Sequence, residues 1–362
     1  MPTNTATLGE SVRWSLSTLY DGIKDARIPT DLKNVETEAQ AFATKYKGKL
    51  SSLSAEELAA AIAKKTEISS QYYRLSQFIH LLFSTDVSDN EVKALMSQIE
   101  QVGTDISNQL LFFRLELSEV DDAKYQEWRN SDSLNNFHYS LERIKDSAKY
   151  QLSEKEEQMI QVKDLTGADA NRKLYGELTA SFEFDFEVDG DRKTLNGSEL
   201  RALRQHPDPD VRKRAMEVFF GRYESEQLVL THLFNNIIRD YNIERKQRGY
   251  SSPIQRKNHG NDLPDDVIDT LHEVCTESNT LVQRYYRLKA KLLGLPNFTL
   301  SDIYAPLPDT ESKYSYEEAK SLVLDSFQGF DPEFYELAKS IFDENHVDVP
   351  VSAKKRGGAY CS

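Results

Sequence analysis

The sequence contains very little cysteine and no long apolar stretch. Its 362 residues include two cysteines, Cys275 and Cys361, which cannot build a disulfide framework and are typical of a reducing compartment. No apolar run approaches the roughly 20 residues that a membrane-spanning helix requires. The first ten residues are polar and lack the basic and apolar regions of a secretory leader. These absences predict a soluble cytoplasmic protein.

Basic residues are fewer than acidic ones. The chain has 45 Lys and Arg against 59 Asp and Glu, which gives a formal net charge of -14. A nucleic-acid-binding protein needs an excess of basic side chains to contact phosphates, so the charge argues against this class. Apolar residues make up 39% of the chain and charged residues 29%, which is enough apolar material for a folded core. At this length we expect two domains.

Glycine and proline are also sparse, and the first half of the chain has the spacing of long helices. Ser54 followed by Glu57 forms a capping-box pattern, which predicts a helix that begins at Ala55. Apolar residues then recur every three or four positions, and a second helix is predicted over 88–117. The polar stretch 84–90 between the two predicts an antiparallel pair of long helices.

One region departs from helical spacing. Phe182, Phe184 and Phe186 alternate with acidic residues, which is typical of a half-buried strand. Asp189 followed by glycine is a turn pattern after which the chain can pair back, so a β-hairpin is predicted over about 181–195. A helix is expected to begin near residue 199, and we predict a domain boundary near residue 200.

Helical spacing returns after this boundary. Asp208 as N-cap and Pro209 at the first helical position predict a helix that continues to Arg248. Another helix is predicted over 264–294, with an interruption of its pattern at Ser278. Its apolar residues are expected to pack inward, with Cys275 on the same buried face. We call these residues the apolar seam: Val267, Leu271, Val274, Leu281, Tyr285, Leu288 and Leu292.

Common catalytic motifs are absent as well. The sequence has no Walker motif, no G-x-G-x-x-G and no G-x-S-x-G, so neither a phosphate-binding loop nor a hydrolase nucleophile elbow has support. Both cysteines lie in apolar contexts that favour a structural role over a catalytic one. Carboxylates are too numerous for any pair to be chosen as an acid–base couple without geometry.

The histidines do not form a zinc-binding pattern. No two of the seven lie closer than thirteen residues, whereas helical zinc sites place them four apart. His272 and Glu273 resemble the start of H-E-x-x-H, but Thr276 stands where the second histidine belongs. We interpret His272 as a solvated residue on a helix surface. The residues by themselves therefore predict an acidic, mostly helical protein and no catalytic constellation.

The final residues differ in character from the rest. Residues 346–350 and 357–361 have β-strand propensity and are separated by the basic run 354–356. A strand at the end of a chain with nothing to cover it is an aggregation hazard that natural domains avoid. We therefore interpret the chain as an incomplete enzyme.

Several segments, taken in order, resemble those of a known family. They are 248–252 followed by 263–267, then 300–307 with the pattern D-x-Y-A-P-L, then 347–362, which ends in K-R-G-G-A-Y-C-S. The last one resembles a G-K-R-x-G-A-Y-C segment, with Ala353 where glycine is usual. By order and spacing, these segments resemble the oligoendopeptidase F family, zinc metallopeptidases of the thimet-oligopeptidase-like group.

The resemblance extends over the whole chain and implies a fold. This fold is mainly α, with long antiparallel helices and a small β-hairpin in an N-terminal helical domain at 1–200. The incomplete first part of a mostly helical metallopeptidase domain with a short sheet follows at 201–362, ending at the substrate-binding strand. In the family, zinc-activated water attacks a peptide carbonyl, and the N-terminal domain walls a channel that excludes folded proteins.

The resemblance also implies which residues take part in the site. In the family, the strand that corresponds to Arg356, Gly357, Gly358, Ala359 and Tyr360 pairs with the substrate backbone, and small residues permit this approach. An ordinary strand end is the alternative for these residues, and a solvated basic run is the alternative for Arg356. The zinc helix of the family follows this strand, so no catalytic residue and no metal ligand is assigned here.

The sequence leaves three functions open. The first is a zinc metalloendopeptidase acting on oligopeptides, of which this chain is the N-terminal portion. That portion is expected to be inactive alone, to bind no zinc and to need a C-terminal catalytic portion with H-E-x-x-H. The alternative is a non-catalytic truncated relative that acts as a helical peptide-binding or interaction protein, and the third is an unrelated helical scaffold. No nucleic-acid or membrane partner is expected.

Overall fold

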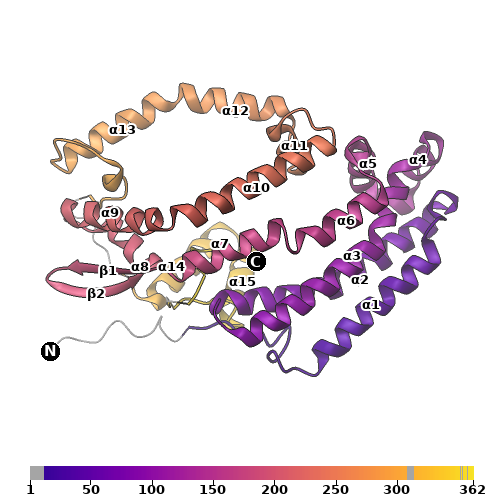
Figure 1. Ribbon diagram of the computed structural model, residues 1–362, viewed down its shortest axis with the longest axis horizontal. Helices are drawn as coiled ribbons and strands as arrows, with labels where there is room; N and C mark the ends of the chain where they lie inside the picture. The colour runs from indigo at the N-terminus through magenta and orange to yellow at the C-terminus, as the bar shows by residue number, and fades with distance from the viewer. Residues whose placement is uncertain (1–11, 308–313, 351, 353, 357) are drawn as a thin grey trace.

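Helices account for most of the protein, as the sequence predicts. The computed structural model describes residues 12–307, 314–350, 352, 354–356 and 358–362. Within these residues the strands form a single two-stranded antiparallel sheet, and all other regular elements are helical (Figure 1). No helix in the described part of the chain is both long and apolar enough to cross a membrane.

The first half of the chain forms a bundle of long helices that run side by side (Figure 1). Ser54 and Glu57 form the predicted capping box, and α2 begins at Ala55 as expected. The side chain of Asp89 accepts hydrogen bonds from two backbone amides and starts α3 two residues later than predicted. The helices of this half are α1 (Arg27–Tyr46), α2 (Ala55–Thr85), α3 (Asn90–Glu119), α4 (Asp122–Arg129), α5 (His138–Ser147), α6 (Glu154–Asp164) and α7 (Ala168–Ala180).

Two buried apolar clusters hold the bundle together. Phe42, Phe112 and Trp128 belong to one cluster, and Tyr20 and Phe78 belong to the other. Helices α2 and α3 approach closely where Gly103 faces Tyr72, because a Cβ on Gly103 would lie 1.9 Å from the Tyr72 hydroxyl. This half therefore has a continuous core of its own.

The predicted hairpin is confirmed. Strands β1 (Glu183–Val188) and β2 (Asp191–Asn196) pair in antiparallel register. Asp189 and Gly190 both have positive φ, 53° and 83°, as in a two-residue turn whose twist fits the right-handed twist of the flanking strands. The side chain of Asn196 caps the short helix α8 (Gly197–Ala202). The three alternating phenylalanines of 182–186 are buried against residues of α8 and the following helix.

The helices of the second half differ from the prediction in two ways. The helix predicted from Pro209 to Arg248 is divided at Glu226, where the Ser225 hydroxyl donates to the Arg222 carbonyl and competes with the helical hydrogen bonds. The helix predicted over 264–294 is divided at Ser278. The resulting helices are α9 (Pro209–Ser225), α10 (Gln227–Gln247), α11 (Pro253–Gly260), α12 (Asp265–Glu277), α13 (Asn279–Leu292), α14 (Tyr316–Phe330) and α15 (Pro332–Asp343).

The apolar seam is not buried, contrary to the prediction. Its residues on α12 and α13 are between 48% and 62% exposed, and Cys275 and Cys361 are also exposed. Every residue of α12, α14 and α15 is at least partly exposed. The spacing identified the apolar face of these helices correctly, but no described element covers that face.

Candidate functional site

The residues implied as substrate-binding lie in a segment that packs against the N-terminal helices. We call residues 345–362 the tail segment, of which the structure describes all but 351, 353 and 357. Its backbone is attached by single hydrogen bonds: the amide of Val349 donates to the Val12 carbonyl (3.0 Å), and that of Arg356 to the Ser84 carbonyl (2.9 Å). Because these bonds go to different partners, the predicted strands do not form in the described residues, and this prediction is wrong.

A buried ion pair shapes the first part of the tail segment. The Asp348 side chain is 2% exposed and accepts a hydrogen bond from Lys355 Nζ. The same ammonium group donates to the backbone carbonyls of Asp348 (3.0 Å) and Pro350 (3.1 Å), and Arg13 lies 3.4 Å from the carboxylate. Lys355 therefore stabilises the turn between Asp348 and its own position. The second carboxylate oxygen of Asp348 is buried and has no described hydrogen-bond partner.

Four of the five implied substrate-binding residues fall within the described structure, and Gly357 lies outside it. The guanidinium of Arg356 lies 5.6 Å from the ring centre of Tyr360, whose hydroxyl donates to the Ser84 hydroxyl. Gly358 has a φ of +92°, and a Cβ there would meet no atom within 4 Å. Ala359 is exposed. The structure thus brings Arg356 and Tyr360 together and leaves the backbone of 358–359 open.

Sequence reasoning missed the residues that hold the tail segment in place. The Trp14 ring packs edge-on against Tyr360, with 6.5 Å between ring centroids. Ser84 is buried near the end of α2 and contacts both Arg356 and Tyr360. Gln77, further back on α2, accepts a hydrogen bond from Ser362 (2.6 Å). No local pattern marks these residues, because their partners lie more than 270 positions away in the sequence.

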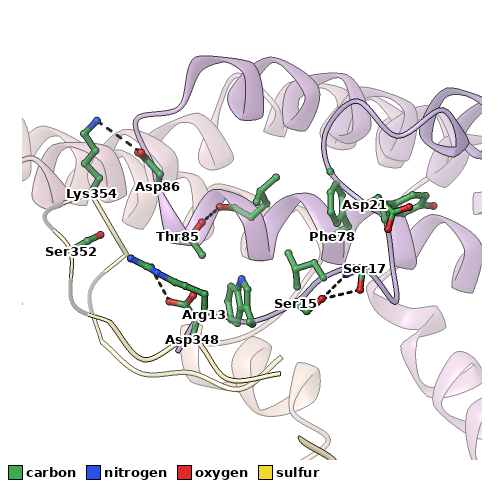
Figure 2. A pocket seen from close by; sticks show the side chains of 15 residues that line it. Arg13, Ser15, Ser17, Asp21, Phe78, Thr85, Asp86, Asp348, Ser352 and Lys354 are labelled. Atoms are coloured by element: carbon green, nitrogen blue, oxygen red, sulfur yellow. Dashed lines mark hydrogen bonds and ion pairs between the residues drawn. The ribbon is translucent and has the colours of Figure 1, made fainter. Parts of the chain in front are cut away.

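A cavity of about 790 Å³ opens between residues 13–22, α2 and the tail segment. Figure 2 shows the pairs Arg13–Asp348 and Lys354–Asp86 at one end, with Phe78 and Asp21 toward the other. Burial acts to raise the pKa of the Asp86 carboxyl. Hydrogen bonds from Ser88 and the charge of Lys354 outweigh it, so the pKa lies below its usual range. The cavity therefore has ion pairs at its rim and aromatic walls.

Two of the other family-like segments join distant parts of the chain through ion pairs. Arg248 forms a bidentate pair with Glu157 of α6, at 2.7 Å and 2.8 Å. Asp302, in the D-x-Y-A-P-L segment, lies 2.6 Å from Arg212, and both side chains are at most 5% exposed. These residues act in packing, and neither pair lines the cavity.

The described residues contain no cluster of three or more His, Cys, Asp or Glu side chains that could hold a metal ion. His272 lies on α12 as a single histidine, without a second ligand of the H-E-x-x-H pattern near it in sequence. The described residues thus do not fit a zinc centre.

Models of known families match the chain in two consecutive stretches. The N-terminal model, described as oligopeptidase F, matches residues 116–184, and the model of peptidase family M3 matches residues 202–362. Together they cover well over half of the chain. The chain belongs to the oligoendopeptidase F group of peptidase family M3. The resemblance of the ordered segments is therefore confirmed.

Similar proteins of known sequence are named as oligopeptidases and are longer than this M3 family chain. The oligoendopeptidase F homolog of Lactococcus lactis subsp. lactis (strain IL1403) is 23% identical over 99% of this chain and 60% of its own length. Oligopeptidase PepF of Bacillus subtilis (strain 168) is 24% identical over 88% of this chain and 48% of its own length. The chain thus spans about half to three fifths of these relatives.

Solved structures share the fold. Oligoendopeptidase-F from Enterococcus faecium has a TM-score of 0.70 and 20% identity, over 88% of this chain and 60% of its own. A structure titled PZ peptidase A with inhibitor 2 has a TM-score of 0.73 and 15% identity, over 92% of this chain and 57% of its own. At these identities the likeness concerns the fold alone.

Proposed function

We propose that this chain is the N-terminal portion of a zinc metalloendopeptidase that hydrolyses oligopeptides. The observation that carries the proposal is the ordered match to the two family models, with relatives that are named as oligopeptidases. Residues 1–200 would form one wall of the substrate channel. Residues 201–362 would provide the scaffold and the substrate-contacting segment, and the setting would be cytoplasmic.

The substrate-contacting residues in this proposal are Arg356, Gly357, Gly358, Ala359 and Tyr360. The exposure of Gly358 and Ala359 supports the proposal, because an extended peptide must reach the backbone N–H and C=O groups with which it pairs. The open space around the Gly358 Cα supports it too, since a backbone can approach there closely. Arg356 would contact a substrate carbonyl or carboxylate.

Zinc would come with a further portion of the enzyme that carries H-E-x-x-H. When bound there, zinc supplies an activated water for attack on the peptide carbonyl. The residues of this chain would bind and orient the peptide. Residues 1–362 alone are therefore expected to be inactive and to bind no zinc.

The direct test is an assay of purified residues 1–362 with fluorogenic oligopeptides, with added zinc and with a chelator. The expected result is no turnover in either condition. Co-expression with the part of the Lactococcus lactis relative that lies outside its match to this chain is expected to give activity that a chelator removes. Zinc-dependent turnover by residues 1–362 alone would contradict the proposal as stated.

The role of Ala359 can be separated from folding in that reconstituted enzyme. Ala359→Pro removes a backbone N–H that an added peptide strand would use, whereas Ala359→Val keeps it. We expect the proline variant to raise KM by about tenfold, the equivalent of one lost hydrogen bond, with little effect from valine. Equal KM values for both variants would argue against pairing at this residue.

A non-catalytic peptide-binding protein is the second candidate. The cavity favours it, because its walls and ion pairs are formed entirely by residues of this chain. The chain has two tryptophans, and Trp14 lines the cavity while Trp128 is buried elsewhere. A Trp128→Phe variant would make Trp14 the sole indole reporter. Saturable fluorescence change with oligopeptides, without reconstituted turnover, would favour this candidate over the peptidase.

A further inference from the structure

The apolar seam lies on two helices that are divided at Ser278, and its large side chains have no cover in the described structure. On α12, Leu271 is 54% exposed, and on α13 the corresponding exposures of Leu281 and Leu288 are 62% and 54%. In Figure 1, α12 and α13 follow one another as an arch at the top of the molecule, away from the bundle of α1–α3. Each of the two helices thus leaves an apolar face exposed.

Such an exposed apolar face is unusual for a helix of a folded globular protein. Helices in globular proteins gain most of their stability from packing an apolar face, and extended exposed apolar patches mark interaction sites. The α14–α15 pair has the same property, with Phe330 at 76% and Leu337 at 65% exposure. In the N-terminal bundle the apolar face of a helix is covered by its neighbours, since Leu58, Ile68 and Leu75 of α2 are fully buried.

The charges beside the seam restrict what can cover it. Helix α12 carries five acidic residues and no Lys or Arg. Helix α13 carries four basic residues and no acidic one, and Lys289 donates to the Ile303 carbonyl. The complementary partner presents basic groups over α12 and acidic groups over α13. A two-fold axis that places α12 of one copy over α13 of another also meets this requirement, so the charges exclude a uniformly charged partner but do not exclude a second copy.

The relatives provide the occupant. The Lactococcus lactis relative has two fifths of its length outside the match to this chain, and that match already takes in 99% of the residues here. We propose that the apolar seam is the docking surface for this further portion of an M3 peptidase. The inference rests on the proposed function and names the partner surface: a helical segment of that portion packs its apolar face on the seam.

The experiment is co-expression of tagged residues 1–362 with the uncovered part of the Lactococcus lactis relative, followed by affinity purification. A second probe is the uncovered part of the Bacillus subtilis relative. Any H-E-x-x-H histidines of the probes are changed to alanine, so that docking is measured without zinc chemistry. The expected result is co-purification in a one-to-one ratio with at least one probe.

The variant Leu271→Lys with Leu288→Lys places two charges on the seam. Because both positions are exposed, the variant should fold, which circular dichroism checks. Its capture of the probe is expected to fall by about tenfold or more, as for central interface residues. The matched control is Leu174→Lys on α7, which is 48% exposed and outside the seam, and capture by this variant should be unchanged.

Each of the remaining outcomes has a definite meaning. Failure of both probes to co-purify, or equal capture by the seam variant, would overturn the docking proposal. A dimer of residues 1–362 that the seam variant dissociates, with no probe bound, would assign the surface to a second copy instead. Docking with no turnover, when the probe histidines are intact, would overturn the proposed function and leave the docking surface standing.

Discussion

Helices α1–α3 and helices α12–α15 have similar amphipathic sequences and different surroundings. Phe42 of α1, Leu75 of α2 and Ile99 of α3 are at most 3% exposed. The helices α12, α14 and α15 contain no buried residue at all. The comparison teaches that helical spacing identifies the apolar face of a helix but carries no information about the element that covers it.

The first and second halves of the chain are joined by polar contacts as well as apolar ones. Glu157 of α6 pairs with Arg248 after α10, and Arg114 of α3 lies 3.6 Å from the same carboxylate. The Glu157 side chain is 5% exposed, so its hydrogen bonds replace those of water. The junction is therefore sensitive to the loss of either charge, in contrast to the solvent-exposed seam.

The largest effect is expected from the covered region. Trp128→Ala removes a side chain that is 1% exposed and whose Nε1 donates to the Leu53 carbonyl at 3.2 Å. Truncation of such a residue leaves a cavity and costs about 3–5 kcal/mol in free energy of unfolding. Urea denaturation followed by circular dichroism measures it. A loss below about 1 kcal/mol would mean that the first core can collapse around the gap.

The second largest effect is expected at the junction formed by Glu157 and Arg248. Glu157→Gln removes the buried carboxylate from Arg248, which keeps only its ion pair with Glu244, and we expect a loss of about 2–3 kcal/mol in the free energy of unfolding. Glu154→Gln on the same helix is the control, because that residue is less buried and pairs with the half-exposed Lys47. Its effect should stay within about 1 kcal/mol. Equal losses for both variants would remove the distinction between junction and surface.

The same pair predicts a pH dependence. Burial acts to raise the pKa of Glu157, but hydrogen bonds from Arg248 and the Leu152 amide outweigh it and place the pKa below its usual value of 4.5. A carboxyl with a lowered pKa in the folded state stabilises the protein above its unfolded pKa and loses this contribution as the pH falls through the folded one. The difference in Tm between wild type and Glu157→Gln should therefore shrink below about pH 4.5.

A glycine pair tests packing density in the two regions. Gly103→Ala places a methyl group against the Tyr72 ring and should destabilise the protein by about 1–2 kcal/mol. Gly329→Ala on α14 meets no atom within 4 Å and should stabilise it by up to about 1 kcal/mol through helix propensity. Thermal unfolding of both variants gives the comparison. Two changes of the same sign would contradict it.

The smallest effect is expected on the seam. Leu271→Ala removes a side chain that is 54% exposed, so the free energy of unfolding should change by at most about 0.5 kcal/mol. The same substitution at the fully buried Leu75 should cost about 2–5 kcal/mol. Chemical denaturation of the two variants compares identical chemistry at a covered and an uncovered site. A large loss at Leu271 would show that the seam is covered in solution.

Local signals in the sequence were sufficient for much of the fold. The capping box at Ser54 located the start of α2 because both partners lie within one turn. The alternating phenylalanines located β1 because a period of two places them all on one face of a strand but spreads them around a helix. The division of the helix at Glu226 was missed, since Ser225 is also compatible with a helix interior. The burial of the apolar seam was wrongly predicted, because burial depends on elements that are distant in the sequence.

The candidate site was predictable only in part. The segment around Arg356 and Tyr360 was named from its resemblance to a family motif, and its proposed role is still to be tested. The residues that contact it, Trp14 and Ser84, come from remote positions with no recognisable motif. The cavity likewise could not be predicted from the sequence, because its shape depends on how three distant segments pack together.

Hydrogen bonds between Val12 and Val349, and between Ser15 and Asn345, close a loop of more than 300 residues. Joining such distant positions is entropically unfavourable until the intervening chain is ordered, so these contacts should form late in refolding. Opening of a large part of the intervening chain raises this entropic cost again, so their amide protons should then exchange with solvent faster. The Ser15 and Val349 amides are thus natural reporters of whether the whole assembly of helices is intact.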